Sequence, residues 1–296
     1  MKGAFAGYHP IVNFTYFMLV LACSMFFMHP ACLAVSLLCG LLYSVRLKGR
    51  RALWFCLLGL LPLMLASALM NPAFNHEGVT ILAYLPSGNP LTLESILYGA
   101  AAAAMLASVV CWFSCYHAVM TSDKFIYLFG RVIPSLSLLL SMALRFVPRL
   151  AAQAKAVANA QRCVGRDMMC GGVIQRAKNG LAIVSALVTW SLENAIETAD
   201  SMKSRGYGLP GRSAFSIYTF DSRDRQALAA VCLAGLYSIC GAMAGGLGFQ
   251  YFPLIKGVPF TAFTTSVFLA YFVLCAMPLI IEWREGRRWK AIESIM

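Results

Sequence analysis

The stretch ILYGAAAAAMLASVVCWFSCYHAVM, residues 96–120, decides the fold class of this chain. It runs for 25 residues without a Lys, Arg, Asp or Glu, and a helix of about 20 apolar residues is enough to cross ~30 Å of hydrocarbon. The rest of the chain has the same character, because 60% of its 296 residues are hydrophobic and only 12% are charged. Soluble domains carry about 25% charged residues. We therefore predict an all-α polytopic membrane protein.

Five further apolar runs could also cross a bilayer. They cover residues 11–27, 31–45, 52–70, 226–246 and 259–281. The run at 31–45 is short for a span. The first run lacks a basic leading region and a small-residue cleavage site, so we expect it to be retained rather than removed as a signal peptide. The prediction is about six transmembrane helices in a plasma or inner membrane.

The basic residues predict the orientation of these helices. Lys and Arg in short loops stay on the cytoplasmic side of a membrane, and Arg46, Lys48, Arg50 and Arg51 follow the second run. If the spans alternate from there, Lys256 is the only one of the 24 Lys and Arg residues outside. The formal net charge of +12 is thus explained by membrane topology, and we predict no nucleic-acid binding because no recognition motif accompanies it.

This topology predicts three regions. Residues 1–131 hold transmembrane helices 1 to 4, residues 132–212 form a cytoplasmic region with two long amphipathic helices, and residues 213–296 hold the last spans and a basic tail. The apolar segment 132–144, which Pro134 interrupts, is interpreted as a re-entrant or interfacial helix. Pro148 is expected to kink the next helix or mark its first turn. We find no strand signal.

Each of the two amphipathic helices ends near an arginine. The first ends in Ala160-Gln161-Arg162-Cys163-Val164-Gly165, and the second in Met202-Lys203-Ser204-Arg205-Gly206-Tyr207-Gly208. Gly206 is predicted to close the second helix in the left-handed conformation, and Gly165 to end the first. One arginine in a last turn is usually a cap that favours the helix dipole. Two similar ends in one insert instead favour docking onto carboxylates of a partner.

The second helix also carries two opposed faces upstream of its end. An apolar stripe recurs at spacings of four and three residues and consists of Leu192, Ile196, Ala199 and Met202. The opposite face is acidic, with Glu193, Glu197 and Asp200. Two carboxylates at i and i+4 could serve acid–base chemistry, but a solvated helix face is the simpler interpretation. The pattern predicts a helix with one side in an apolar environment.

The sequence offers no convincing catalytic, cofactor or metal site. The 11 cysteines lie mostly inside spans without a CxxC pair, and the histidines are scattered. Residues 206–213, GYGLPGRS, approximate the phosphate loop GxxxxGK[ST], but they follow a helix and have Arg in place of Lys. A multi-span enzyme acting on lipid-linked substrates remains the alternative, although the spans lack a catalytic acidic pair. A self-contained secondary carrier is a third possibility.

Three segments carry a resemblance to a known family. They are Leu144-Arg145-Phe146-Val147-Pro148-Arg149, Ala160-Gln161-Arg162, and residues 197–208, ETADSMKSRGYG. With these, the chain resembles, over nearly its full length, the T component of energy-coupling factor transporters, which include the CbiQ-type cobalt transport permeases. The typical Ala-Arg-Gly of that family is replaced here by Gln161-Arg162-Cys163 and Ser204-Arg205-Gly206, so the first motif lacks its glycine.

The resemblance implies a non-catalytic subunit, without a cofactor, of a vitamin or transition-metal importer in the lipid bilayer. Two cytosolic ABC ATPases would each receive one arginine in an acidic groove. The implied ATPase-coupling residues are Arg162, Arg205, Gln161, Ser204 and Gly206. A membrane-embedded, substrate-binding S component would contact the apolar face formed by Leu192, Ile196, Ala199 and Met202. Closure of the ATPases would then move the helices and tip the S component.

Overall fold

The computed structural model describes residues 3–75, 77–84, 90–130, 133–166, 172–209 and 218–293. The chain divides into two units, one formed by Met1–Phe125 with Tyr218–Met296 and the other by Ile126–Ile217. We call the first the membrane bundle and the second the hairpin unit. His76, residues 210–213 of the phosphate-loop-like stretch, and the boundaries proposed at 131–132 and 212–213 lie outside the described residues. The three-region division therefore stays a prediction.

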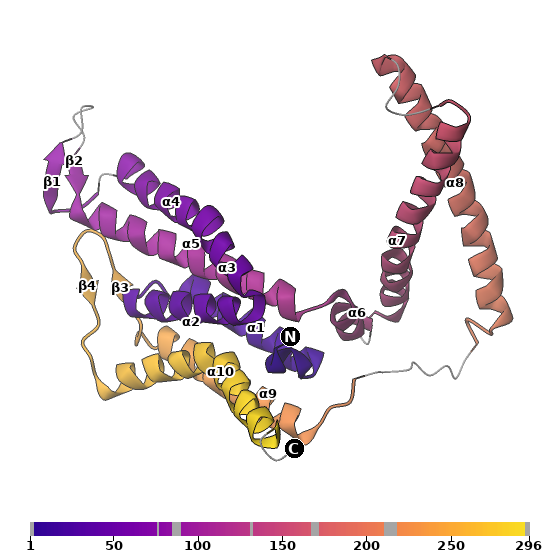
Figure 1. The fold of residues 1–296 in the computed structure, drawn as a ribbon. Helices are drawn as coiled ribbons and strands as arrows, with labels where there is room; N and C mark the ends of the chain where they lie inside the picture. The colour runs from indigo at the N-terminus through magenta and orange to yellow at the C-terminus, as the bar shows by residue number, and fades with distance from the viewer. Residues whose placement is uncertain are drawn as a thin grey trace. The chain divides into compact units, whose positions relative to one another are not determined.

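The membrane bundle is built almost entirely of helices (Figure 1). Its elements are η1 (Ala4–Gly7), α1 (Pro10–Phe26), α2 (Pro30–Lys48), α3 (Arg50–Phe55), the π-helical turn η2 (Cys56–Leu60), α4 (Leu61–Phe74), β1 (Ile81–Tyr84), β2 (Pro90–Thr92), α5 (Leu93–Val119), the start of α6 (Ser122–Gly130), α9 (Ser222–Met243), β3 (Phe249–Gln250), β4 (Lys256–Gly257) and α10 (Ala262–Glu293). The predicted all-α class is confirmed.

Two short antiparallel hairpins, β1–β2 and β3–β4, correct the expectation of no strands. None of the four strands exceeds four residues, which is too short for an alternating pattern to show in the sequence. The first hairpin is fixed by Glu94, whose carboxylate accepts a hydrogen bond from the Thr80 backbone N–H at 3.2 Å. Both hairpins close connections between helices and leave the helical class unchanged.

Within the described residues, six helical segments are long and apolar enough to span a membrane. They are Pro30–Lys48, Arg50–Phe74, Leu93–Val119, Ser135–Cys163, Ser222–Met243 and Ala262–Arg287. The predicted number is confirmed, but the membership differs. The first predicted span forms α1, which has only 17 residues, whereas segment 135–163 qualifies by length and composition because its apolar half continues into its basic half without a break.

An aromatic cluster forms the centre of the bundle. Phe5, Tyr16, Phe17, Tyr43 and Trp112 are fully buried. Tyr16 meets Trp112 edge-on with ring centroids 6.1 Å apart. Rings of this kind contribute about 0.5–1.5 kcal/mol per pair beyond the area they bury. The cluster joins η1, α1, α2 and α5 into one core.

Trp112 also has a polar anchor in this core, since its indole N–H donates to Ser36 Oγ at 3.0 Å. The segment from α3 to α4 has the opposite character. Several of its large apolar side chains are exposed, among them Leu57, Leu58, Leu65 and Met70. Such a surface is expected where a helix faces lipid rather than protein.

Two histidines that looked scattered in the sequence begin helices in the same way. His9 precedes Pro10 and its Nδ1 accepts the backbone N–H of Ile11 at 3.3 Å. His29 precedes Pro30 and its Nδ1 accepts the N–H of Ala31 at 3.2 Å. Proline is favoured at the first helical position because the N–H it lacks would be unsatisfied there. The His-Pro pair is thus the N-terminal signal of α1 and α2.

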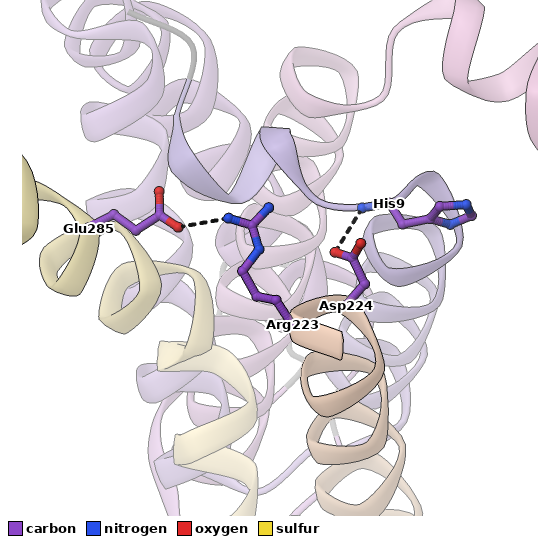
Figure 2. Close-up of polar contacts among 4 residues, drawn as sticks. All are labelled: His9, Arg223, Asp224 and Glu285. Carbon is purple, nitrogen blue, oxygen red and sulfur yellow. Dashed lines mark hydrogen bonds and ion pairs between the residues drawn. The ribbon is translucent and has the colours of Figure 1, made fainter. Parts of the chain in front are cut away.

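A polar cluster ties the start of α9 to the N-terminal segment and to α10 (Figure 2). Asp224 Oδ1 accepts the His9 backbone N–H at 3.3 Å, and Oδ2 accepts that of Asp221 at 3.3 Å. Arg223 pairs with Glu285 at 3.3 Å and lies 4.4 Å from the ring centroid of Tyr8. The chain thereby re-enters the bundle at a position fixed by two other segments, the N-terminal segment and α10.

Candidate functional site: the hairpin unit and its two tips

The hairpin unit contains two long helices, α7 (Pro134–Cys163) and α8 (Val173–Ser204). Pro134 stands at the first position of α7, so it begins this helix rather than interrupting an apolar one. Pro148 lies inside α7 rather than in its first turn. A proline there removes one backbone hydrogen bond without ending the helix when neighbouring turns hold it. Each amphipathic helix predicted from the sequence is therefore continuous and about 45 Å long.

The two helices run in opposite directions and pack against each other where they cross (Figure 1). Phe146 of α7 stacks on Trp190 of α8 with ring centroids 5.9 Å apart and planes at 16°. The Arg149 guanidinium lies 5.4 Å from the centroid of the Trp190 ring. We call Phe146, Arg149 and Trp190 the waist of the hairpin. The waist could not be predicted from the sequence, because the pairing depends on how two distant segments cross.

The waist separates the two arginine-bearing ends. Arg162 lies 16 residues beyond Phe146, and Arg205 lies 15 residues beyond Trp190. At 1.5 Å per helical residue, each arginine is about 23 Å from the waist along its own helix. Because α7 and α8 are antiparallel, the two ends point to opposite poles of the hairpin, so the structure does not bring Arg162 and Arg205 together.

The end of α7, tip 1, is closed by a left-handed glycine. Gly165 has φ 81, its N–H donates to the Arg162 carbonyl at 2.9 Å, and the Arg166 N–H donates to the Gln161 carbonyl at 2.9 Å. This pair of bonds is the Schellman motif, which satisfies carbonyls left unpaired at a helix end. The expectation that Gly165 ends this helix is confirmed.

The end of α8, tip 2, is closed in the same way. Gly206 has φ 76, its N–H donates to the Lys203 carbonyl at 3.0 Å, and the Tyr207 N–H donates to the Met202 carbonyl at 3.0 Å. A left-handed conformation costs most side chains about 1–2 kcal/mol, and glycine avoids that cost. Gly206 therefore has the closing role expected from the sequence.

The arginines differ in their position relative to these glycines. Arg162 lies three residues before Gly165 and inside the last helical turn, whereas Arg205 lies immediately before Gly206 as the C-cap of α8. When the two helix ends are aligned on Gly165 and Gly206, Lys203 corresponds to Arg162. Arg162 therefore lies two residues further back into its helix than Arg205 does.

Both tips present their charge on an accessible surface. Arg162, Ser204 and Arg205 are exposed, and Gln161 and Gly206 are half-buried. Among the described residues, the Arg205 side chain makes no hydrogen bond or ion pair. Exposed apolar residues follow each arginine in the chain, Val164 at tip 1 and Tyr207 and Leu209 at tip 2. Each tip thus carries a bidentate hydrogen-bond donor next to exposed apolar residues, a combination that suits a groove containing a carboxylate.

The apolar stripe predicted on α8 is largely exposed. Leu192 and Ile196 expose 62% and 65% of their surface, Ala199 is exposed and Met202 is half-buried. The stripe continues toward the start of α8 through exposed Leu181, Val184 and Val188, at the same spacings of three and four. The signal for this extension is the same periodicity of apolar residues that predicts the stripe. An exposed apolar stripe of several turns marks a surface for lipid or protein.

The described residues contain no group of three or more His, Cys, Asp or Glu side chains that could hold a metal ion. Glu193, Glu197 and Asp200 are exposed on α8. The hairpin unit therefore offers charged tips and an apolar surface, which are features for binding other proteins.

Comparison with known proteins agrees with this geometry. The family CbiQ, described as cobalt transport protein, matches residues 10–217. A relative from Lactobacillus helveticus, an energy-coupling factor transporter transmembrane protein EcfT, is 39% identical over 109 residues, which cover 36% of this chain and 39% of the relative. The EcfT of Streptococcus equi subsp. equi is 32% identical over 106 residues, covering 36% of this chain and 39% of the relative. The aligned segments thus span about two-fifths of these relatives.

Proposed function

Because the chain belongs to the CbiQ cobalt transport protein family, we propose that it is the energy-coupling transmembrane subunit of an ABC importer of the energy-coupling factor type. It is a multi-pass membrane protein. In this proposal the chain hydrolyses no ATP. It connects two cytosolic ATPases with a membrane-embedded S component that binds a vitamin or a transition-metal ion.

The observation that carries this proposal is the pair of exposed arginine tips at opposite poles of one hairpin. A guanidinium forms two parallel hydrogen bonds with a carboxylate, and removal of one member of such a pair in a buried groove costs about 3–5 kcal/mol. In the proposal, Arg162 enters a groove of one ATPase and Arg205 a groove of the other. Gln161, Ser204 and Gly206 shape the two contacts.

In this proposal, the waist couples the movements of α7 and α8, and the apolar stripe of α8 passes the movement on to the S component. Phe146, Arg149 and Trp190 hold α7 against α8, so a displacement of one tip also moves the other helix. Leu192, Ile196, Ala199 and Met202 would contact the S component, which shifts when the ATPases close. The cytoplasmic location of the hairpin is part of this proposal and is supported by the one-sided distribution of Lys and Arg.

The experiment removes both arginines. Arg162→Ala combined with Arg205→Ala should leave the amount of membrane-inserted chain unchanged but lower recovery of the ATPases in co-purification, and ATP-driven uptake, by at least about tenfold. Lys155→Ala combined with Lys178→Ala is the matched control, because it removes one exposed positive charge from each helix without changing either terminal motif. Unimpaired uptake by the double arginine variant would refute the proposal.

A further inference from the structure

A second candidate site lies in the membrane bundle, far in sequence from the hairpin tips. A cavity of about 270 Å³ opens between the last turns of α2 and the second half of α10. Its lining consists of Arg46, Leu279, Ile280, Glu282 and Trp283. It thus combines one positive group, one negative group, one indole ring and two aliphatic side chains.

The position of this cavity matches a membrane–water boundary. Glu282 is 20 residues beyond Ala262 in α10, which corresponds to about 30 Å of helix and so to the thickness of the hydrocarbon core. Arg46 and Lys48 stand in the last turn of α2. The Arg287 guanidinium carbon lies 3.7 Å from the centroid of the Trp283 ring. Tryptophan is enriched at the level of lipid headgroups.

The charged groups of the cavity are close but do not satisfy each other. Arg46 and Glu282 line the same cavity, yet the two form no ion pair among the described residues. Glu282 Oε1 is buried and has no hydrogen-bond partner in the described part of the chain. A buried acceptor without a donor destabilises the structure, and it does so more strongly when it is charged. The Glu282 carboxylate therefore has one oxygen without a hydrogen-bond donor.

We propose that this cavity binds the headgroup of a phospholipid with a primary ammonium group, of the phosphatidylethanolamine class. The phosphate pairs with Arg46, and the ammonium donates hydrogen bonds to Glu282. Leu279 and Ile280 contact the apolar part of the lipid next to the headgroup, and Trp283 flanks it at the boundary.

The composition of the lining selects this headgroup over others. A purely anionic lipid would satisfy Arg46 but would be repelled by Glu282. A choline headgroup carries a positive charge without an N–H, so it cannot supply the donor that the carboxylate lacks. Soluble phosphoethanolamine has the right charges but lacks acyl chains, and it leaves Leu279 and Ile280 without a partner.

The test uses native mass spectrometry of the purified full chain in an equimolar mixture of phosphatidylethanolamine and phosphatidylcholine with identical acyl chains. The wild-type chain should retain the ethanolamine lipid about tenfold more than the choline lipid, as expected for a charge-assisted hydrogen bond. Glu282→Gln should reduce this preference to less than about twofold. Arg46→Ala should lower retention of both lipids about tenfold, since both carry the phosphate.

Arg51→Ala is the control, because it removes an exposed positive charge at the same end of the bundle without touching the cavity. It should change neither lipid's retention by more than about twofold. Size-exclusion chromatography verifies that each variant is folded. Equal retention of the two lipids by the wild-type chain, as for a water-bridged Arg46–Glu282 pair, would overturn the proposal. So would an ethanolamine preference that survives Glu282→Gln, or displacement of the lipid by equimolar soluble phosphoethanolamine.

Discussion

Single residues decide how each tip of the hairpin ends. Gly165 and Gly206 close the two helices with the same pair of backbone hydrogen bonds, although the arginines lie three residues and one residue before them. Helix closure is local, and a glycine after a last turn with a basic residue is a signal contained in a few neighbouring residues. This is why both closing residues could be predicted from the sequence, whereas the different registers of the arginines became visible only with the hydrogen bonds.

Gly206→Ala should weaken the contact of tip 2 without removing its arginine. A side chain at φ 76 costs about 1–2 kcal/mol, so the last turn of α8 should fray and Arg205 should lose its fixed direction. We expect ATPase co-purification to fall several-fold. Gly172→Ala serves as the control, because Gly172 has an ordinary φ of −69 and no atom within 4 Å of an added Cβ. Equal binding by wild type and Gly206→Ala would show that tip 2 needs no left-handed residue.

The two N-cap histidines should make the bundle sensitive to acid. Burial lowers the pKa of His9, against an opposing effect of Asp224, and burial lowers the pKa of His29. Below a pH of about 6.5, the unfolded chain takes up protons at these residues more readily than the folded chain, so stability falls as the pH falls. Protonation of Nδ1 also abolishes the cap that each ring provides.

The measurement is the thermal midpoint of the detergent-solubilised chain at pH 7.5 and pH 5.5. The midpoint should be lower at the acidic pH, and His9→Asn with His29→Asn should reduce the difference, because asparagine caps a helix without titrating. His117→Asn, in the last turn of α5, is the comparison. A pH dependence that the double variant retains in full would assign it to other groups.

At the scale of elements, the spacing of apolar residues within one segment predicts the helices, but it does not predict which helices pack against each other. The apolar stripe of α8 and the transmembrane helices follow from residues within one segment, so the sequence contains them. The waist could not be predicted, because Phe146 and Trp190 meet only when α7 and α8 cross antiparallel. Helix α1 is too short to count among the six candidate spans, and α7 is long enough to be counted instead. Hydropathy defines a run, but the caps and prolines of the folded chain define where its helix begins and ends.

Trp190→Ala should loosen the hairpin. It removes the stacked Phe146 contact and the Arg149 contact, each worth about 0.5–1.5 kcal/mol. Amide hydrogen exchange in the crossing segments of both helices should become about tenfold faster or more. Trp283→Ala, in the membrane bundle, should leave exchange in the hairpin unchanged. If the crossing segments stay fully protected in Trp190→Ala, other contacts hold the two helices together.

Gly241→Ala should destabilise the bundle although alanine normally favours a helix by about 1 kcal/mol over glycine. An added Cβ at Gly241 would collide with the Val267 side chain of α10, and overpacking of this kind costs about 1–3 kcal/mol. Gly245, which lies four residues later and beyond the end of α9, has φ 85 and no atom within 4 Å of an added Cβ, so it does not pack against a neighbouring helix. Gly286→Ala, with no neighbour within 4 Å, should not lower the thermal midpoint, whereas Gly241→Ala should.

At the scale of the whole molecule, charge distribution predicts which parts face the cytoplasm. In a variant without the exposed Cys163 and Cys240, a cysteine at position 256 should react with a membrane-impermeant maleimide added to intact cells, and cysteines at positions 50 and 204 should react only after the membrane is opened. Labelling of position 204 from outside would place the hairpin on the wrong side for cytosolic ATPases.

The antiparallel hairpin has a consequence for the stoichiometry of any assembly built on it. Two helices that cross head to tail are related by an approximate twofold axis through Trp190 and Phe146, and they offer comparable ends on either side of that axis. A dimeric motor with the same symmetry could be saturated by one copy of this chain. Because Arg162 and Arg205 are placed differently at their helix ends, the two halves of such a symmetric dimer would make non-equivalent contacts with this chain.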